Sequence, residues 1–252
     1  MISVIVCSRL SPENDLHFRN ISKTIGDEFE YIRIDNTANQ YNICSAYNEG
    51  VKRSRGDILV FVHEDVFFME SNWGKALNSK FTDQSIGLIG VAGSQYLFNN
   101  IAGWVAPGRP FIKGQVIHEL NNGNTYNLTV FSWDKDDSDV VAVDGLFFSI
   151  RRDLFDNIRF DDVIFNGFHF YDLDICMQIR RTHRLIVTKD ILLKHQSGGS
   201  FNEIWKEYAQ RFLQKYSAEL PASCTQSIPD ISHRISFENF DLKGKAPQIT
   251  IA

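Results

Sequence analysis

The run Ile58–Val62 constrains this sequence most, because its five residues are all apolar and it ends abruptly in His63, Glu64 and Asp65. An apolar run of this length is typical of a strand that is buried on both faces, as in a parallel sheet covered by helices. Carboxylates after such a strand lie at its carboxyl end, where open α/β sheets bind ligands. Two acids are costly to desolvate there unless they meet a cation or a polar ligand. We therefore expect either a metal-assisted ligand site or an ordinary acidic loop.

Strand and helix patterns alternate through the first ninety residues, which predicts a mostly parallel sheet with helices packed against it. The expected strands cover residues 2–7, 29–34, 58–62 and 86–92. The expected helices cover residues 11–25, 43–54 and 72–81. Ser11-Pro12-Glu13 supplies a cap, a first-turn proline and an acid for the first of these helices, and Gly26 supplies its stop.

The pattern changes over residues 93–139, where Gly, Asn and Pro predict hairpins and long loops over the mouth of the sheet. Further strands are expected over residues 140–150, 185–188 and 191–195, and helices near Arg151 and over 170–182 and 201–216. The tail after Pro221 has weak periodicity and is expected to wrap the surface or lie disordered. The fold class is therefore α/β, with a mostly parallel central sheet flanked by helices and a small antiparallel or loop region.

The composition excludes several classes of protein. A net charge of -5 and a pI near 5.8 give no basic field for nucleic acid or an anionic membrane. Four cysteines without a C-x-x-C pair indicate buried, reduced thiols rather than disulfides or a zinc site. No apolar segment approaches the roughly 20 residues that span a bilayer, so we expect a cytoplasmic protein and leave peripheral association with the membrane open. The 20 Phe residues favour a Phe-rich core over a stacking site for a sugar or base.

Three common ligand motifs are missing from the sequence. The first strand is followed by Cys7-Ser8-Arg9-Leu10 instead of G-x-G-x-x-G, which argues against a dinucleotide-binding domain. Neither a P-loop motif nor a G-x-S-x-G nucleophile elbow is present. A phosphorylated ligand would therefore need a metal ion here rather than a glycine cradle.

Acidic residues also follow two other expected strands. Asp35-Asn36 follows the second strand, and Asp144 interrupts the strand pattern of residues 140–150. Because the carboxyl ends of parallel strands lie along one edge of a sheet, these acids and the Glu64-Asp65 pair are placed to share one site. Asp35-Asn36 offers hydrogen-bonding groups for a nucleobase edge or ribose hydroxyls, or else it starts an ordinary turn.

Two acids begin the helix expected over residues 170–182. Asp172 lies in its first turn, where the helix dipole stabilises an anion and a carboxylate can take a proton from an incoming hydroxyl. Asp174 lies about 200° further round the helix, so the two cannot both face one site. We expect one to be catalytic and the other to cap the helix or form an ion pair. Simple compensation of the helix dipole is the alternative.

Two histidines are candidates for the same site. His195 follows an apolar run and precedes a glycine-containing loop over residues 196–200, so that its imidazole can complete a metal site begun by Asp65. A hydrogen-bonded structural histidine is the alternative. His63 is closer to Asp65 in sequence, but neighbouring strand residues point to opposite faces, so we expect His63 to be buried under the loop.

Seven short segments, which span about residues 2–200, carry a recognisable pattern. They are VIVCSR (4–9), IDN (34–36), YNEG (47–50), GDILVFVHED (56–65), VDG (143–145), YDLD (171–174) and KH (194–195). In this order they resemble the family 2 glycosyltransferases of the GT-A fold, in particular the bacterial branch linked to capsule and surface-polysaccharide synthesis. Their ordered set makes the resemblance specific.

The resemblance implies roles for the residues at the matching positions. Asp65 takes the metal-binding last position of a D-x-D-type element, in which His63 stands where the family has the first acid. His195 matches a late ligand of the metal or the diphosphate. Asp172 takes the position of the catalytic base, although Tyr171 stands where the family usually has Glu.

Other matches concern the donor and the acceptor. Asp35 matches the acid that contacts the uracil or another base, and Asn48 matches the Asn of the helix under the nucleotide. The implied donor-binding set is Ser8, Arg9, Asp35, Asn36, Asn48, Glu64 and Asp65. The implied acceptor-binding set is Asp144, Gly145, Trp104 and Trp133. The two tryptophans would stack on a sugar, and core packing is the alternative for both.

The implied protein is a metal-dependent, inverting glycosyltransferase that uses Mg²⁺ or Mn²⁺, a UDP-sugar and a hydroxyl of a glycan or lipid-linked acceptor. One domain is expected over residues 1–220, with a nucleotide-binding half (1–92) and an acceptor-binding and catalytic half (93–200), followed by a tail (221–252). A nucleotidyltransferase is one alternative, although the loop after the first strand lacks glycine. The other is a catalytically silent, sugar-nucleotide-binding scaffold. The sequence carries no signal for an oligomeric state.

Overall fold

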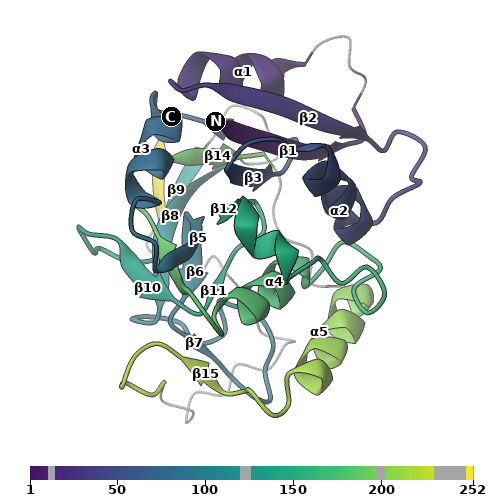
Figure 1. The fold of residues 1–252 in the computed structure, drawn as a ribbon. Helices are drawn as coiled ribbons and strands as arrows, with labels where there is room; N and C mark the ends of the chain where they lie inside the picture. The colour runs from purple at the N-terminus through teal and green to yellow at the C-terminus, as the bar shows by residue number, and fades with distance from the viewer. Residues whose placement is uncertain (11–14, 120–125, 197–201, 230–247, 252) are drawn as a thin grey trace.

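A computed structural model describes residues 1–10, 15–119, 126–196, 202–229 and 248–251. Its centre is a seven-stranded sheet with the order β10-β13-β5-β12-β3-β1-β2 (Figure 1). The strands are β1 (Ile2–Ser8), β2 (Phe29–Asp35), β3 (Ile58–Val62), β5 (Ile86–Gly90), β10 (Ser138–Val140), β12 (Phe147–Arg151) and β13 (Arg184–Val187). β2, β1, β3, β5 and β13 point the same way, whereas β12 and β10 run against their neighbours. The prediction of a mostly parallel central sheet is confirmed.

The described α-helices all lie within the predicted ranges. They are α1 (Leu16–Thr24), α2 (Ile43–Arg53), α3 (Trp73–Lys80), α4 (Tyr171–Ile179) and α5 (Glu203–Lys215). Figure 1 shows α1 and α3 on one side of the central sheet and α2 and α4 on the other. The expected helix start at residues 11–13 lies outside the described residues. The described part of α1 is capped by Asp15, and Gly26 follows the helix with a φ of 67°.

The order of the first three strands fixes where a ligand can bind. β1 lies between β2 and β3, so the chain crosses to one side of β1 and then to the other. All five residues of β3 are buried, as the apolar run predicts. In an open α/β sheet, such a reversal places the ligand site at the carboxyl ends of the strands on either side of it. Those ends are Ser8, Asp35 and the turn after Val62.

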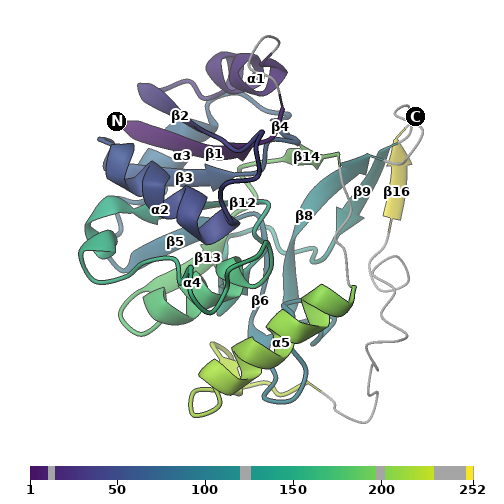
Figure 2. The ribbon, with the colours of Figure 1, turned by 90° about the vertical axis from the view of Figure 1, so that its right-hand side faces the viewer.

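A second sheet stands at these carboxyl ends (Figure 2). Its order is β11-β6-β8-β14-β4, and β9 pairs with β8. Its strands are β4 (Val66–Phe68), β6 (Ala92–Ser94), β8 (Ile112–Glu119), β9 (Tyr126–Val130), β11 (Ala142–Val143) and β14 (Leu193–His195). Only residues 63–65 separate β3 from β4, so the chain passes from one sheet into the other at this turn. The region expected to hold hairpins and loops is thus a hairpin-containing sheet.

Parts of the tail also form strands. β15 (Ala222–Ser223) pairs with β7 (Tyr96–Leu97), and β16 (Gln248–Ile251) pairs with β9. Residues 230–247 of the predicted tail lie outside the described residues. The short helix expected near Arg151 is the 3-10 helix η2 (Arg152–Asp156). Within the described ranges, the helices are all too short or too polar to cross a membrane.

Aromatic side chains fill the core between α2 and the central sheet. Phe61 and Phe148, on adjacent strands, stack with their ring centroids 5.3 Å apart, and Tyr47 of α2 lies 4.9 Å from Phe61. This packing confirms the Phe-rich core. The cysteines are free, as expected, but only Cys44 and Cys176 are buried. Cys7 is partly buried, and Cys224 is exposed because it lies in the surface tail just after β15.

Asp174 forms the ion pair that was expected of one of the two acids in α4. Its carboxylate is fully buried and accepts hydrogen bonds from Lys215 Nζ at 2.6 Å, Tyr216 Oη at 2.6 Å and Gln178 Nε2 at 2.8 Å. Because two of these donors lie at the end of α5, Asp174 fastens α5 to α4. It is therefore engaged in holding the two helices together.

We expect Asp174→Ala to lower the free energy of unfolding by about 3 kcal/mol, because removing one partner of a buried pair leaves the others unsatisfied. Urea denaturation followed by circular dichroism measures this change. The control is Glu203→Ala, which breaks the exposed Lys206–Glu203 pair and should cost less than about 1 kcal/mol. Similar losses in the two variants would contradict the fastening role of Asp174.

Candidate active site

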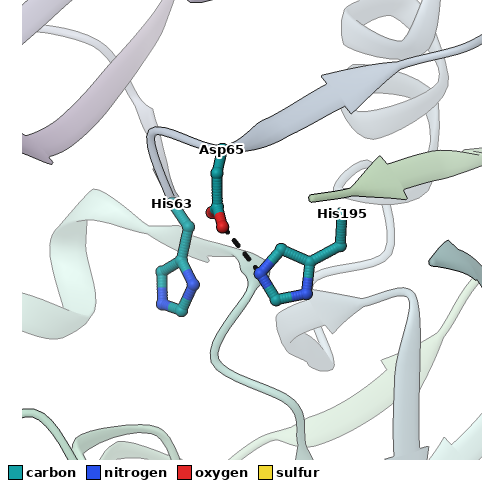
Figure 3. A group of neighbouring side chains, drawn as sticks. All are labelled: His63, Asp65 and His195. Carbon is teal, nitrogen blue, oxygen red and sulfur yellow. Dashed lines mark ion pairs between the residues drawn. The ribbon is translucent and has the colours of Figure 1, made fainter. Parts of the chain in front are cut away.

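The turn after β3 carries possible metal ligands. His63, Asp65 and His195, together called the ligand group below, each offer one ligand atom, and these atoms lie within 4.8 Å of one another. Figure 3 shows the Asp65 carboxylate between the two imidazole rings, with Oδ1 of Asp65 3.4 Å from Nε2 of His195. Two imidazole nitrogens and a carboxylate suit a divalent transition-metal ion.

Strand pairing brings His195 to this turn. β14 ends at His195 and runs antiparallel to β4, in a register that places His195 opposite Val66. The backbone N–H of Gln196 donates to the carbonyl oxygen of Asp65 at 3.0 Å, which joins the ends of the two strands. Residues far apart in the sequence therefore meet because β4 and β14 are neighbours in the second sheet.

The position of His63 differs from the sequence-based expectation that it lies under the loop, apart from Asp65. β3 ends at Val62, and residues 63–66 form a turn in which the N–H of Val66 donates to the carbonyl oxygen of His63 at 3.2 Å. Because strand alternation stops at Val62, the side chains of His63 and Asp65 both lie next to His195. Burial, and then the neighbouring His195, lower the pKa of His63, so that its ring is neutral and offers a lone pair.

A further histidine near the ligand group was not predicted. His118 of β8 lies opposite His195 in the parallel β8–β14 pair, and the two ring centroids are 6.1 Å apart. Burial lowers the pKa of His118. The only signal in the sequence was the alternation of residues 112–119, which falls in a region expected to contain loops.

Asp172 lies in the first turn of α4, where it is partly buried. Its Oδ2 accepts a hydrogen bond from the N–H of Gly145 at 2.9 Å, and its Oδ1 accepts one from the N–H of Leu173 at 2.9 Å. Burial, and then the charge of Asp144, raise the pKa of Asp172 to about 7. A carboxyl group with this pKa can exchange a proton near neutral pH, as general-base catalysis requires.

The residue that caps α4 has an unusual backbone conformation. Phe170 has a φ of 64°, in the left-handed region, which costs a residue with a Cβ about 1–2 kcal/mol. Its ring packs against Trp205 and Phe212 of α5, with centroids 5.1 Å and 5.5 Å away. The packing of α5 therefore holds the start of α4, and with it Asp172, in place.

A chain of hydrogen bonds joins Asp172 to the ligand group. The hydroxyl of Tyr171 donates to the carbonyl oxygen of Gly145 at 2.9 Å and lies 2.6 Å from Nε2 of His63. Tyr171 and Asp172, consecutive in α4, thus hold the carbonyl and the N–H of Gly145. A Cβ on Gly145 would lie 2.3 Å from the Tyr171 hydroxyl, so this position requires glycine. The ligand group and Asp172 belong to one site.

Glu64 holds the turn after β1. Its Oε2 accepts hydrogen bonds from the hydroxyl of Ser8 at 2.6 Å and from the N–H groups of Arg9 and Leu10 at 3.0 Å and 3.3 Å. The guanidinium of Arg9 lies 4.5 Å from the ring centroid of Phe168. Ser8, Arg9 and Glu64 therefore lie together at the ends of β1 and β3, and their contact with a donor stays a prediction.

The three polar residues predicted near the nucleoside have different surroundings. Asp35 is exposed at the end of β2. The amide of Asn36 is buried and bonds both the N–H and the carbonyl of Tyr41. The amide of Asn48 bonds both backbone groups of Phe160. Asp35 thus presents an exposed carboxylate, whereas the two amides hold the backbone at Tyr41 and Phe160. A nucleotide contact stays a prediction for all three residues.

The two tryptophans predicted for the acceptor also differ. Trp104 is buried, and its indole N–H donates to Oδ2 of Asp144 at 3.1 Å. The other carboxylate oxygen of Asp144 accepts from the N–H of Leu146 at 2.9 Å. Trp133 is 67% exposed, so that its ring has a face available for stacking. Acceptor binding stays a prediction for all of these residues.

Comparison with known protein families adds an independent observation. Residues 3–216 match the model of a family described as "Glycosyltransferase like family". The chain belongs to this family. The family predicted from the ordered segments is therefore confirmed, and the match ends at Tyr216, the residue that caps α5.

Two known proteins resemble this member of the family at the level of sequence. The streptomycin biosynthesis protein StrF of Streptomyces griseus is 27% identical over 193 residues, which are 73% of this chain and 64% of StrF. The protein "ATP synthase subunits region ORF 6" of Fuscovulum blasticum is 25% identical over 203 residues, which are 77% of this chain and 74% of that protein. The chain therefore spans less than two thirds of StrF.

Two solved glycosyltransferase structures share the fold. GalNAc-T7 with UDP, GalNAc and Mn²⁺ is 12% identical at a TM-score of 0.53, covering 79% of this chain and 43% of that one. The mannosyltransferase PcManGT of Pyrobaculum calidifontis, in complex with GDP-Man and Mn²⁺, is 14% identical at a TM-score of 0.52, covering 86% and 63%. These likenesses confirm the GT-A-type α/β fold.

Proposed function

We propose that this protein transfers a sugar from a nucleoside-diphosphate sugar to a hydroxyl of an acceptor, with Asp172 as the general base. The observation that carries the proposal is the hydrogen-bonded chain from His63 through Tyr171 and Gly145 to Asp172. This chain connects the ligand group to a carboxyl group whose raised pKa suits a general base, and that connection supports the proposal. Membership of the glycosyltransferase-like family supports the same reaction.

The ligand group fits a divalent cation. Oδ1 of Asp65, Nε2 of His195 and a ring nitrogen of His63 would hold it, and the two imidazoles favour Mn²⁺ over Mg²⁺, which prefers oxygen ligands. When bound, such an ion stabilises the negative charge that develops on a diphosphate leaving group. Both solved relatives named above are complexes with Mn²⁺.

Asp172 would act on the acceptor. Its ionised carboxylate takes the proton of the acceptor hydroxyl while the oxygen attacks the anomeric carbon. The new carbon–oxygen bond forms as the bond to the diphosphate breaks, and the electron pair leaves with the diphosphate. Attack from the side opposite to the leaving group inverts the anomeric configuration. The hydrogen bond from the N–H of Gly145 keeps the carboxylate oriented.

The proposal includes a donor half and an acceptor half of the chain. We assign the nucleoside to the carboxyl ends of β1 and β2 in the half 1–92, where Ser8 and Asp35 lie opposite each other, with a UDP-sugar as the first donor to test. We assign a glycan or lipid-linked acceptor to the half 93–200, where Trp133 is exposed. A cytoplasmic role in the synthesis of a bacterial surface polysaccharide fits both assignments.

Calorimetric titration of UDP, and then of GDP, into the purified protein tests the proposal, first with Mn²⁺ and then with EDTA. We expect micromolar binding with Mn²⁺ and binding at least tenfold weaker with EDTA, because a cation held by the ligand group would attract the negatively charged diphosphate. Release of nucleoside diphosphate from UDP-sugars then tests turnover. Equal affinity with and without metal would contradict the cation site. Metal-dependent binding without turnover of any donor would favour the silent scaffold.

A further inference from the structure

The hydroxyl of Tyr171 has two neighbours and one hydrogen atom. It lies 2.9 Å from the carbonyl oxygen of Gly145, which can only accept, and 2.6 Å from Nε2 of His63. Both contacts are hydrogen bonds in one arrangement only, in which the hydroxyl donates to Gly145 and accepts from Nε2–H of His63. Tyr171 is buried.

This direction decides which nitrogen of His63 can bind a metal. A neutral imidazole carries its hydrogen on one nitrogen and a lone pair on the other. With the hydrogen on Nε2, the lone pair is on Nδ1. Figure 3 shows one ring nitrogen of His63 on the side of the ring that faces Asp65 and His195, and the other directed away from them. Nε2 faces Tyr171, so the nitrogen that faces the ligand group is Nδ1.

We propose that Tyr171 is a positioning residue for the metal site: its hydroxyl holds His63 in the tautomer and ring orientation that present Nδ1 to a divalent transition-metal ion shared with Asp65 and His195. The role rests on the proposed function, since it needs the cation site, and it adds a residue that does not touch the ion. Partners of this kind typically change metal affinity by about 10–100-fold when they are removed.

The chain offers a matched control in Tyr47. Its ring is also buried and lies 5.7 Å from the ring of Tyr171, in the same aromatic cluster. Its hydroxyl, however, finds no hydrogen-bond partner in the part of the chain that the structure describes. Tyr171→Phe and Tyr47→Phe therefore remove the same atom from the same core, and only the first removes a contact with His63.

The experiment measures the affinity of Mn²⁺ alone for the full chain, from the free-ion signal in electron paramagnetic resonance. We expect Tyr171→Phe to weaken Mn²⁺ binding by about 10–100-fold and Tyr47→Phe to change it by less than twofold. In Tyr171→Phe, pulsed measurements of nitrogen coupling should show the loss of one of two imidazoles from bound Mn²⁺. Melting temperatures near that of the wild type confirm that both variants are folded.

A double-mutant cycle separates positioning from general damage to the fold. In a His63→Ala background, Tyr171→Phe should have no further effect on Mn²⁺ affinity, because Tyr171 acts through His63. A further loss of tenfold or more in that background would overturn the proposal. Equal Mn²⁺ binding by the wild type and Tyr171→Phe would overturn it while leaving the cation site intact. Absence of Mn²⁺ binding by the wild type would overturn the cation site as well.

Discussion

Asp172→Asn should lower the rate of sugar transfer by about 1,000-fold or more, within the range that general-base catalysis contributes together with the orientation of the acceptor. The substitution keeps the shape of the side chain and one oxygen for the N–H of Leu173 or Gly145, but an amide cannot take the proton of the acceptor. Release of nucleoside diphosphate from the donor, with acceptor present, measures the loss.

Nucleotide binding should separate this role from a general defect. Because the base acts on the acceptor, the affinity of Asp172→Asn for UDP with Mn²⁺ should stay within about twofold of the wild type. The control is Asp153→Asn, which changes an exposed Asp in the first turn of η2 and should leave the rate unchanged. A tenfold loss of UDP affinity in Asp172→Asn would count against the assignment of this residue to the acceptor.

The pH dependence provides a second readout of the same role. The carboxyl group is active when ionised, so kcat/KM of the wild type should fall about tenfold per pH unit below the pKa of Asp172, which burial and Asp144 raise to about 7. A bound cation stabilises the ionised carboxylate and so shifts this fall in kcat/KM to lower pH. The residual activity of Asp172→Asn should not show the fall.

Stability should follow the opposite trend with pH. An unfolded Asp titrates near 3.9, whereas folded Asp172 titrates near 7, so the folded protein binds the proton more tightly. The wild type therefore loses stability as pH rises through this interval, and Asp172→Asn does not. The measured quantity is the melting temperature of Asp172→Asn minus that of the wild type. This difference should be more positive at pH 8 than at pH 5.

Asp65→Ala should weaken the binding of Mn²⁺ by about 100-fold, because it removes the only carboxylate of the ligand group. UDP affinity measured with Mn²⁺ should then fall to the value that the wild type shows in EDTA. Titrations of Mn²⁺, and of UDP with and without Mn²⁺, measure both effects. Since Asp65 lies in a turn rather than in the core, the melting temperature without metal should change little.

The control for Asp65→Ala is Glu70→Ala. Glu70 is exposed and is the second residue after β4, whereas Asp65 directly precedes β4. Removing it subtracts the same charge near the same strands without changing the ligand group. If the two variants lost UDP affinity equally, a general effect of charge would explain the result and the ligand role of Asp65 would be wrong.

The long elements of the fold could be predicted from the sequence because their patterns are long enough to read. β3 coincides with its apolar run, and every described helix lies within its expected range. The second sheet could be predicted only in part, since β14 lies within the strand expected over residues 191–195, whereas β4 and β6 have only three residues each. Alternation needs about four or more residues to be recognised, and these strands exist because neighbouring strands pair with them.

The site was predictable in part for the same reason. Asp65, His195 and Asp172 were expected at strand and helix ends, and the structure brings them into one site. His63 was misplaced because its side chain belongs to a turn, where strand alternation does not apply. Both departures from the family pattern, His63 and Tyr171, contact each other. They are 108 residues apart, so the sequence gives no sign that they form a pair.

The left-handed backbone at Phe170 has a consequence for the smallest fragment that can carry this site. The conformation is costly by itself, and the rings of Trp205 and Phe212 that hold Phe170 come from α5, beyond the last residue of the ligand group. A fragment cut after His195 would keep every proposed ligand and the base, but the start of α4 would be released to an ordinary helical conformation and Asp172 would turn away. We therefore expect the functional boundary of the chain to lie after α5, where the family match also ends.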